Sequence, residues 1–578
     1  MTITTKEMKR NNIYKTVLGL AMAALTLTAC TDEWDDHYDG KSSNVLGGTL
    51  WDAIQQDNNL SNFANVVRAC GYDKALASSQ VFTVFAPTND CFSSSEAEAL
   101  IAAYNAEKGH VDDDENTTVK EFLQNHIALY NHSVSSLSND SIVMMNGKYA
   151  ILSAGSIDKS PFLTSNRHYS NGILFTVGNQ VTFFPNLFEY MRKDSNLDSL
   201  YQFFYNSRFY RSEFQPEESV AGGIEDGKTV YLDSVFKQQN DLFDYDFLDA
   251  KLNREDSTYW MIAPTNRVWR ELIDEYSSYF NYDNTVEERD SMVYTNPRLA
   301  IVKGTIFSRT NNKDAALRDS AMSTSAVTGI YRSSYWGADS LHYYQYNNPL
   351  GANGVLTGTN NVECSNGIMM ISDDWKIDKK ETFFKTIIVE AEGSGSIREV
   401  SKTTNSSTGE QEETITPRTR RVEADNPFYN KVSKNYFVEF EPTKTTINHD
   451  VTFNIENVLS NIGYDIYLVT APALANDSNA TAIQRLPTVL RCTLGYHDQE
   501  GVTQTQQLVS SVTTQPDIVD HILLAENFKF PVCSFGLDEE NPQVFLNVET
   551  RVTSTQQRNN THTRTMRIDC IILKPHIE

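Results

Sequence analysis

The side chains best suited to catalysis or metal binding are scattered along this 578-residue chain. None of the eleven histidines pairs with another at the i, i+4 spacing that places two metal ligands on one helix face. His126 and His132 are the one close pair. They offer either a metal or ligand contact or a hydrogen-bonded framework, and we favour the framework because no carboxylates accompany them. The acidic run at 112–115 lacks the alternating ligands and glycine of a calcium loop, so we interpret it as a solvated loop.

Sequence motifs of the common enzyme classes are missing from the chain. It contains no GxSxG, HExxH, P-loop or GxGxxG pattern. Two carboxylates able to hydrolyse a glycosidic bond could still meet in space among the 75 acidic residues. We therefore predict a protein without enzymatic activity, cofactor or metal, with glycan processing as a remaining alternative.

Aromatic side chains give the clearest indication of binding. One group crowds a short stretch in the middle of the chain and supplies our ligand-binding candidates, Tyr331, Tyr335, Trp336, Tyr343 and Tyr344, with Tyr346 beside them. A second group comprises Tyr276, Tyr279, Phe280 and Tyr282. Exposed aromatic rings stack on sugars or pack at protein interfaces, whereas buried ones simply fill a core. The sequence leaves both interpretations open.

Cysteine spacing argues against a zinc knuckle or a thioredoxin-type site, because no CxxC pair occurs. Cys30 stands apart near the N-terminus. The other six lie mostly in apolar runs that favour buried thiols: Cys70, Cys91, Cys364, Cys492, Cys533 and Cys570. The spacing does not decide whether Cys492 forms a disulfide with Cys533 or with Cys570.

The N-terminus carries the pattern of an export signal. Lys9, Arg10 and Lys15 precede an apolar stretch at 17–27, which is too short to span a bilayer. The stretch ends in Leu27-Thr28-Ala29-Cys30, which resembles the lipobox of bacterial lipoproteins, and an ordinary signal peptide is the alternative. The resemblance implies lipidation of Cys30 after removal of residues 1–29.

Acidic residues follow Cys30 at once. The run 31–36 holds four acids and resembles the surface-export signal of Bacteroidetes lipoproteins, with a solvated tether as the plainer interpretation. We expect an outer-membrane protein anchored by lipid, facing outward. No later stretch approaches the roughly 18 apolar residues of a spanning helix, so the lipid would be its only anchor.

Composition sets broad limits on the rest of the chain. Hydrophobic residues make up 40% and charged residues 21%, which is ordinary for globular proteins. There are 49 basic and 75 acidic residues, for a formal charge of −26. Non-specific nucleic-acid binding is disfavoured, because it needs Lys and Arg to displace counterions from phosphates.

An internal repeat organises the first two thirds of the chain. The pattern starting at Leu50-Trp51-Asp52 returns at Leu187-Phe188-Glu189. Ala86-Pro87-Thr88-Asn89 returns as Ala263-Pro264-Thr265-Asn266. Ser170-Asn171-Gly172-Ile173 returns as Ser365-Asn366-Gly367-Ile368. The order is kept while the spacing grows, so the second copy contains insertions.

Each repeated piece predicts a local structure. Ser61 can cap a helix that buries Phe63, Val66 and Val67 and ends before Gly71. Residues 81–85 predict a buried strand that the following proline ends. Thr88-Asn89-Asp90 and Asn266 then supply caps for the helices that follow, and the Asn-Gly pairs predict tight turns with φ > 0.

These residues resemble the fasciclin (FAS1) family. Its first signature block is similar to Thr83-Val84-Phe85-Ala86-Pro87-Thr88-Asn89, its second to Ser170-Asn171-Gly172-Ile173-Leu174-Phe175, and the block between them to Asn125-His126 with Tyr130-Asn131-His132. The second copy lacks a clear middle block. The resemblance implies wedge-shaped α/β domains with a small β core, used for adhesion or ligand contact.

The last 200 residues change to strand patterns. β-Favouring runs lie at 436–440, 451–455, 464–469, 489–494, 544–548 and 566–573, and 380–390 follows the second repeat directly. A helix is indicated only around 518–524. The pattern predicts a β-sandwich, with a jelly roll as one arrangement.

The predicted fold class is therefore α+β, with two tandem fasciclin-like domains followed by an all-β sandwich. We expect a signal peptide at 1–29, an acidic tether at 30–44, and fasciclin-like domains at 45–183 and 184–378. The sandwich follows at 379–578 with an exposed segment at 391–427. The expected function is non-enzymatic binding or adhesion, capturing a glycan or peptide beside a TonB-dependent outer-membrane importer or other surface lipoproteins. A structural accessory subunit is the alternative.

Overall fold

The computed structural model describes residues 46–111, 115–135, 139–214, 216, 220–225, 228–233, 236–309, 321–331, 340–537 and 542–576. They fall into two compact units that divide between Phe184 and Pro185. The predicted signal peptide and tether, including Cys30, lie outside the described residues. No helix in the described ranges is long and apolar enough to cross a membrane.

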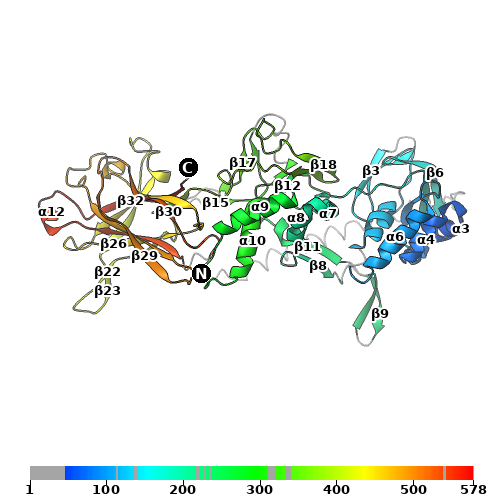
Figure 1. Ribbon diagram of the computed structural model, residues 1–578, viewed down its shortest axis with the longest axis horizontal. Helices are drawn as coiled ribbons and strands as arrows, with labels where there is room; N and C mark the ends of the chain where they lie inside the picture. Colours follow the sequence, from blue (N-terminus) through cyan, green and yellow to red (C-terminus); the bar gives the residue numbers. More distant parts are fainter. Residues whose placement is uncertain are drawn as a thin grey trace, which may run out of the picture. The chain divides into compact units, whose positions relative to one another are not determined.

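The first unit places helices beside one mixed sheet (Figure 1). Its helices are α3 (Leu50–Gln56), η1 (Asn58–Leu60), α4 (Ser61–Ala69), α5 (Asp73–Ala77), α6 (Ser94–Glu107), η3 (Val119–Leu123) and η4 (Gln124–His126). Its strands, β1 (Phe82–Pro87), β2 (Ile127–Leu129), β3 (Asn139–Val143), β4 (Tyr149–Ser153), β5 (Ser156–Ile157), β6 (Ser160–Tyr169) and β7 (Gly172–Val177), have the order β2-β1-β7-β6-β5-β4-β3.

Strands β1 and β7 form the centre of this sheet. They run parallel, every residue of both is buried, and Phe82 pairs with Gly172. Gly172 has φ +152°, and a Cβ there would lie 2.0 Å from the Phe82 carbonyl oxygen. Only glycine allows this close approach of the two backbones.

The second unit begins with a similar arrangement. Its first helices are α7 (Leu187–Lys193), η5 (Ser195–Leu197), α8 (Asp198–Phe204), η6 (Asp241–Phe243), α9 (Asn266–Tyr276), η7 (Ser277–Tyr279) and α10 (Arg289–Val302). A four-stranded sheet has the order β13 (Ile306–Ser308), β12 (Tyr259–Pro264), β19 (Gly367–Ser372) and β18 (Asn360–Cys364). Strands β12 and β19 are parallel, Tyr259 pairs with Gly367, and Gly367 meets the Tyr259 carbonyl oxygen as Gly172 meets that of Phe82.

The insertions of the second copy form small two-stranded sheets. These are β8 (Tyr210–Phe214) with β11 (Phe236–Asn240), β9 (Val220–Glu225) with β10 (Lys228–Asp233), β14 (Met322–Ser323) with β17 (Gln345–Tyr346), and β15 (Gly329–Tyr331) with β16 (Ser340–His342).

One asparagine in each copy braces the helices against the sheet. Asn171 Oδ1 accepts from Leu50 N at 2.8 Å, and its Nδ2 donates to the carbonyl oxygens of Leu76 and Ser78. Asn366 makes the equivalent bonds to Leu187 N and to the carbonyl oxygens of Leu252 and Arg254. The Asn side chain therefore acts as a brace, and only the following glycine takes positive φ.

The predicted caps at Thr88-Asn89-Asp90, Asn266 and Ser61 are wrong. Ser93 caps α6 in a capping box with Glu96, Asn266 lies inside α9, and Ser61 is the first residue of α4. Asn89 and Asn266 instead reach back to the preceding helices, because their Oδ1 atoms accept from Asn62 N and Ser199 N. They cap α4 and α8 from outside, where local sequence offers no capping side chain.

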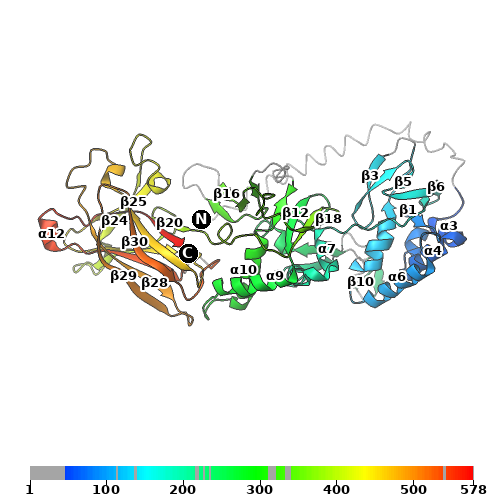
Figure 2. The same ribbon diagram turned by 45° about the horizontal axis from the view of Figure 1, so that its top comes forward.

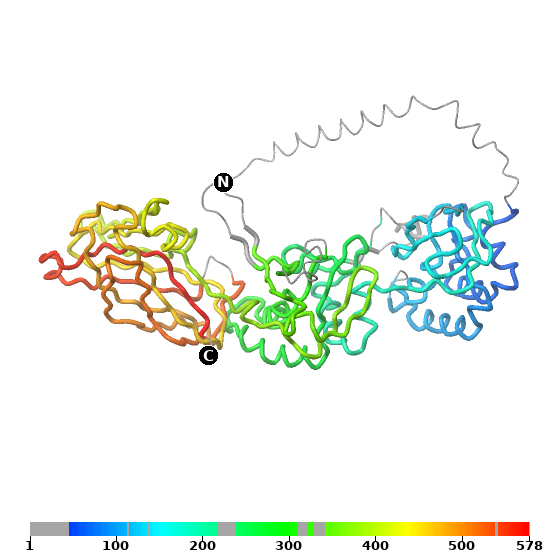
Figure 3. The backbone as a smooth tube through the Cα atoms, turned by 90° about the horizontal axis from the view of Figure 1, so that it is seen from above, coloured from blue at the N-terminus to red at the C-terminus, as the bar shows by residue number. Residues whose placement is uncertain are grey.

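Two antiparallel sheets complete the second unit and pack face to face (Figure 3). The first has the order β24 (Ile415–Arg421), β25 (Tyr436–Pro442), β32 (Met566–Pro575), β27 (Gly463–Thr470) and β30 (Asp520–Lys529), with β20 (Ile387–Glu390) also paired to β32 (Figure 2). The second has the order β21 (Ile397–Val400), β26 (Asp450–Ile455), β31 (Val544–Thr550), β28 (Val489–His497) and β29 (Thr503–Thr513). We call them the six-stranded and five-stranded sheets.

Short elements fill the connections of these sheets. They are β22 (Lys402–Thr404), β23 (Gln411–Glu413), η9 (Ser433–Asn435), η10 (Ala473–Ala475) and α12 (Ser554–Arg558). Ring contacts such as Phe440 with Phe453, 6.0 Å between centroids, join the two inner faces.

Two expectations for this region change. The segment 391–427 is not exposed throughout, because β21 and β24 at its ends belong to the two sheets and Ala391, Val400 and Ile415 are buried. Its middle is the hairpin β22–β23. The helix indicated around 518–524 is the strand β30, in which Ile522 and Leu524 face the core while Leu523 is 45% exposed.

A short segment joins the first part of the second unit to the two sheets. Asn281 Nδ2 donates to Gln499 Oε1, Tyr282 OH donates to the Phe535 carbonyl oxygen, and buried Asp283 lies 3.0 Å from His497 Nδ1. Asp283 Oδ1 also accepts from the backbone and hydroxyl of Thr285. We call residues 281–285 the clasp.

Candidate functional site

The predicted aromatic binding candidates do not come together in the described residues. Tyr335 and Trp336 lie outside those residues, and of Tyr331 only the backbone in β15 is described. Tyr343 is 37% exposed, whereas Tyr344 is 8% exposed and packs in a core with buried Tyr346. Of the second aromatic group, Tyr276, Phe280 and Tyr282 are likewise buried. In these cases tyrosine and phenylalanine fill a core.

His126 and His132 have different surroundings. Buried His126 places Nδ1 2.7 Å from the Phe122 carbonyl oxygen, and its Nε2 accepts from Val181 N at 3.0 Å. Since the carbonyl can only accept, Nδ1 carries the proton and the ring is neutral. Burial lowers the pKa of His126 to about 4. His132 is half-buried and its Nε2 contacts the Leu129 carbonyl oxygen. His126 is therefore a framework residue.

All six described cysteines are free thiols. Cys364, Cys492, Cys533 and Cys570 are buried, and burial raises the pKa of Cys492 and Cys533 to about 12. Neither a Cys492–Cys533 nor a Cys492–Cys570 disulfide is present in the structure.

The outer face of the five-stranded sheet gathers polar side chains in register. Along β31, Val544, Leu546 and Val548 point into the core, so Phe545, Asn547 and Glu549 point outward. Strand pairing sets three rows across this face: Asn454, Phe545, Gly495 and Thr505; Thr452, Asn547, Thr493 and Gln507; and Asp450, Glu549 and Arg491. We call these rows the polar face.

The first row contains an aromatic platform. A Cβ on Gly495 would lie 2.1 Å from the Phe545 ring, so the ring lies across the glycine. The Arg398 guanidinium carbon stands 4.8 Å from the ring centroid, and Arg398 Nη1 donates to the Pro542 carbonyl oxygen. The ring and guanidinium together form a flat, donor-rich surface.

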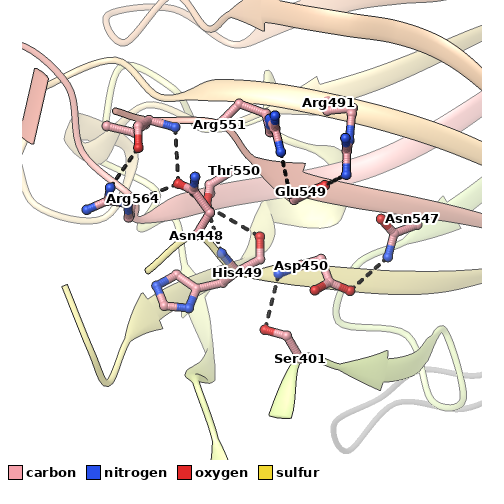
Figure 4. A network of polar contacts seen from close by, with 11 residues as sticks. Ser401, Asn448, His449, Asp450, Arg491, Asn547, Glu549, Thr550, Arg551 and Arg564 are labelled. Atoms are coloured by element: carbon pink, nitrogen blue, oxygen red, sulfur yellow. Dashed lines mark hydrogen bonds and ion pairs between the residues drawn. The ribbon is translucent and has the colours of Figure 1, made fainter. Parts of the chain in front are cut away.

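Hydrogen bonds and ion pairs fix the other two rows (Figure 4). Asn547 Nδ2 donates to Asp450 Oδ2 and to Thr452 Oγ1, each at 2.9 Å. Arg491 and Arg551 both pair with Glu549, which is 18% exposed. Such interlocked side chains are held in place before any ligand arrives, which lowers the entropic cost of binding.

A groove of about 320 Å³ lies on the outer face of the other, six-stranded sheet. Its floor includes Ile388, Val469, Ile572 and His521, and residues 430–435 form one wall. Three non-glycine residues of this wall have left-handed backbones: Asn430 (φ 63°), Lys434 (φ 49°) and Asn435 (φ 63°). Strained backbone of this kind is concentrated at functional sites.

A cluster of acids lies beside this groove. Ligand atoms of Glu390, Asp569 and Cys570 lie within 4.8 Å of one another, which makes them the metal-ligating group found among the described residues. Burial, with help from Glu390 and Glu392, raises the pKa of Asp569 to about 8. Burial also raises the pKa of Glu392 to about 7. Crowded acids with raised pKa values often mark functional sites.

Sequence reasoning missed both places. The rows of the polar face draw on four strands that are far apart in sequence, and only their register brings the side chains together. The acid cluster brings together Glu390 of β20 and Asp569 of β32. Along the chain, these are the first and last strands of the six-stranded sheet. The available signal was the alternation of polar residues along β31 and β28, together with the closely spaced acids Glu390 and Glu392.

A family model described as the fasciclin domain matches residues 58–180. This stretch contains β1, β7 and the brace Asn171. Residues 58–180 form a fasciclin domain. No curated protein matches the chain.

Solved structures give weaker likenesses. A FAS1 domain pair from the insect cell adhesion molecule fasciclin I is 12% identical, with 56% of this chain and 98% of that chain covered at a TM-score of 0.19. The CBM22-1 xylan-binding domain of Xyn10C from Paenibacillus barcinonensis is 10% identical, with 34% and 96% covered at a TM-score of 0.19. A further xylan-binding domain from CBM 22 is 14% identical, with 31% and 95% covered at a TM-score of 0.17. At such TM-scores these likenesses define neither fold nor ligand for this chain.

Proposed function

We propose that the chain is a non-enzymatic surface lipoprotein that captures a glycan. In this proposal Cys30 carries the lipid, two tandem fasciclin-like domains occupy 45–183 and 184–378, and the sandwich at 379–578 supplies the binding face. The observation that carries the proposal is the polar face, where a preorganised network surrounds the Phe545–Arg398 platform.

The chemistry of this face suits a hydroxyl-rich ligand. Arg398 and Arg491 offer N–H donors, while Asn547, Thr493 and Gln507 carry side-chain oxygens that accept. Gln507 is exposed and Thr493 is half-buried, so both are within reach from solvent. Each sugar hydroxyl can donate and accept, and the flat platform matches the apolar face of a pyranose ring.

A peptide ligand, capture beside an outer-membrane importer, and docking as a structural accessory subunit stand as alternatives. Docking is favoured by the exposed apolar side chains of β3 and β4 in the fasciclin domain. Val143 pairs with Tyr149, and the two are 49% and 56% exposed, with Ile151 at 47%. Neighbouring exposed apolar side chains are typical of protein contact surfaces.

The test uses the soluble chain from Asp32 onward, which retains every described residue. A glycan array would identify ligands, and calorimetry would measure their affinity. We expect Phe545→Ala and Gln507→Ala each to weaken binding about tenfold, a loss near 1.4 kcal/mol. Tyr429→Ala is the matched control, because Tyr429 is an aromatic residue of the same sandwich that is 38% exposed and lies off the polar face.

Three outcomes would contradict the proposal. Unchanged affinity in the Phe545 and Gln507 variants, with loss in Tyr335→Ala or Trp336→Ala, would move the site to the second repeat. Failure to bind any glycan, with co-purification of a porin-like partner, would favour docking. Turnover of a polysaccharide would show an enzyme. Protease shaving of intact cells would check outward orientation, because a periplasmic protein would be protected.

A further inference from the structure

The acid cluster beside the groove has more carboxyl groups than the one cation seen beside it. Glu390 is 9% exposed and Asp569 is 1% exposed. Glu392 is half-buried and close enough to Asp569 to raise its pKa. The cation seen beside them is Lys434, whose Nζ lies 3.4 Å from Glu390 Oε1 and whose side chain is 40% exposed. When all three acids are ionised, they and the Lys434 ammonium carry a formal charge of −2.

Strand geometry explains how the acids meet. Glu390 is the last residue of β20 and pairs with Cys570 of β32. In the ladder between β27 and β32, Val469 pairs with Cys570 and Thr470 with Ile568, so Asp569 is an extra residue at a β-bulge. A bulge re-aims side chains, and here it brings the neighbours Asp569 and Cys570 to the same cluster.

Two buried carboxylate oxygens lack hydrogen-bond partners among the described atoms. These are Glu390 Oε2 and Glu392 Oε2. In contrast, Glu390 Oε1 accepts from Ser433 Oγ at 2.7 Å. Leaving a buried polar atom unpaired is costly, and for a charged oxygen the cost is greater still. Glu390 therefore holds an unsatisfied, buried carboxylate oxygen, and a ligand atom of this side chain lies within 4.8 Å of those of Asp569 and Cys570.

We propose that Glu390 and Asp569, whose ligand atoms lie within 4.8 Å of each other, bind one divalent cation, calcium, with Glu392 close by as a further carboxylate. A +2 ion cancels the formal charge of the cluster and gives the unpaired oxygens a ligand. Calcium is favoured because the donors are carboxylate oxygens, which hard cations select. Cys570 offers a soft sulfur donor, which calcium does not select, so it takes no part in holding calcium.

The site is connected to the groove through its wall. Ser433 N donates to both oxygens of Asp569 at 3.1 Å, and Ser433 Oγ donates to Glu390. The cation would bind the same carboxylates that Ser433 contacts. This would stabilise the left-handed backbone of residues 434 and 435. Calcium binding and order in the groove wall are therefore coupled. This inference does not depend on the glycan proposal, because it concerns the opposite sheet.

The experiment uses the chain from Asp32 onward after treatment with chelator, with calcium ions alone as the probe. Calorimetry should show one calcium per chain. Calcium at a hundredfold excess over its Kd should raise the Tm of the second unit by about 3 °C. Hydrogen exchange of the Ser433 amide should slow in calcium. The double variant Glu390→Gln/Asp569→Asn should lose all three responses, and its calcium-free Tm should equal or exceed that of the parent, since like charges have been removed.

The matched control is Glu423→Gln/Asp425→Asn, which makes the same charge change at exposed positions of the segment before the wall. It should keep calcium binding. Should the first double variant fail to fold, Glu392→Gln alone tests the same claim, because its calcium affinity should fall at least tenfold. Cys570→Ser should bind calcium as before.

Two results would overturn the proposal. One is absence of calcium binding by the parent chain. The other is preference for zinc that is abolished by Cys570→Ser, which would mean a thiolate site in place of a carboxylate one.

Discussion

At the scale of single residues, His126 shows how a buried ring can fix both the structure and its pH dependence. Its two nitrogens join the Phe122 carbonyl oxygen to the Val181 amide, so both partners need the neutral ring. The pKa in the folded state is about 4, against an ordinary 6.5. Because the folded pKa is depressed, the unfolded chain takes up the proton first, and stability falls as pH drops from about 6.5 to about 4.

We therefore predict an acid-dependent loss of about 3 kcal/mol in the free energy of unfolding of the fasciclin domain, from the 2.5-unit difference in the pKa of His126. Hydrogen-exchange mass spectrometry of peptides from β1 and β7, at pH 7, 5.5 and 4, would measure it. His126→Gln should lower stability at pH 7 and remove this part of the pH dependence.

His132→Gln is the matched control, since the half-buried His132 ring bonds only to the nearby Leu129 carbonyl oxygen, and this variant should keep the pH dependence of the parent. Equal pH dependence in the parent and in His126→Gln would contradict the assignment of a neutral buried ring.

At the scale of elements, the parallel strand pairs depend on one glycine each. Gly172 and Gly367 adopt φ +152° and +156°, and a Cβ at either would lie 2.0 Å from a backbone oxygen of the partner strand. Backbone oxygens in a central strand cannot move aside cheaply, so the clash must part the strands.

We predict that Gly172→Ala destabilises the first unit by about 3 kcal/mol or more and leaves the Tm of the second unchanged. Gly367→Ala should destabilise the second unit by a similar amount and leave the Tm of the first unchanged. Scanning calorimetry of the chain from Asp32 onward would separate the two effects. Gly155→Ala is the control, because nothing lies within 4 Å of a Cβ there, and it should be neutral. A similar loss for all three variants would contradict the argument.

Elements were predictable from sequence where burial and periodicity agree. The apolar runs of β1, β27 and β32 are buried, and each was expected as a strand. β29 was missed because it is an edge strand of exposed Thr and Gln with little apolar alternation. β30 was mistaken for a helix because residues 522–524 are all apolar although only Leu523 is exposed, so the sequence hides the period of two.

The sites were harder to predict than the elements. Asn89 and Asn266 cap helices that precede them by many residues, which local cap rules do not foresee. Asp450, Glu549 and Arg491 become neighbours only through the order β26-β31-β28, and strand order is a tertiary property. The place of Asp569 in the cluster depends in addition on a β-bulge, which no residue type in β32 predicts.

At the scale of the whole molecule, the clasp makes the second unit larger than one domain. Asn281, Tyr282 and Asp283 make hydrogen bonds with residues of the two sheets, and the 0% exposed Asp283 accepts from Thr285 and meets His497. Asn281 N and O also bond to Ser460 Oγ and Cys533 N. Polar contacts buried to this degree cost several kcal/mol when one partner is removed, so the second repeat and the sandwich should unfold together.

We predict two calorimetric transitions for the chain from Asp32 onward, one for each unit, with the ratio of van't Hoff to calorimetric enthalpy near one for the second. Asn281→Ala/Asp283→Ala should split the second transition in two, because it removes the contacts that couple the second repeat to the sandwich. Asn284→Ala should leave two transitions, since Asn284 is exposed and its side chain reaches only Glu500 and Gln499.

Three transitions in the parent chain would mean that the clasp does not couple the two parts. Two transitions in the double variant, shifted together, would mean that the apolar contacts of Phe280 with Phe383 and Phe535 suffice to hold them.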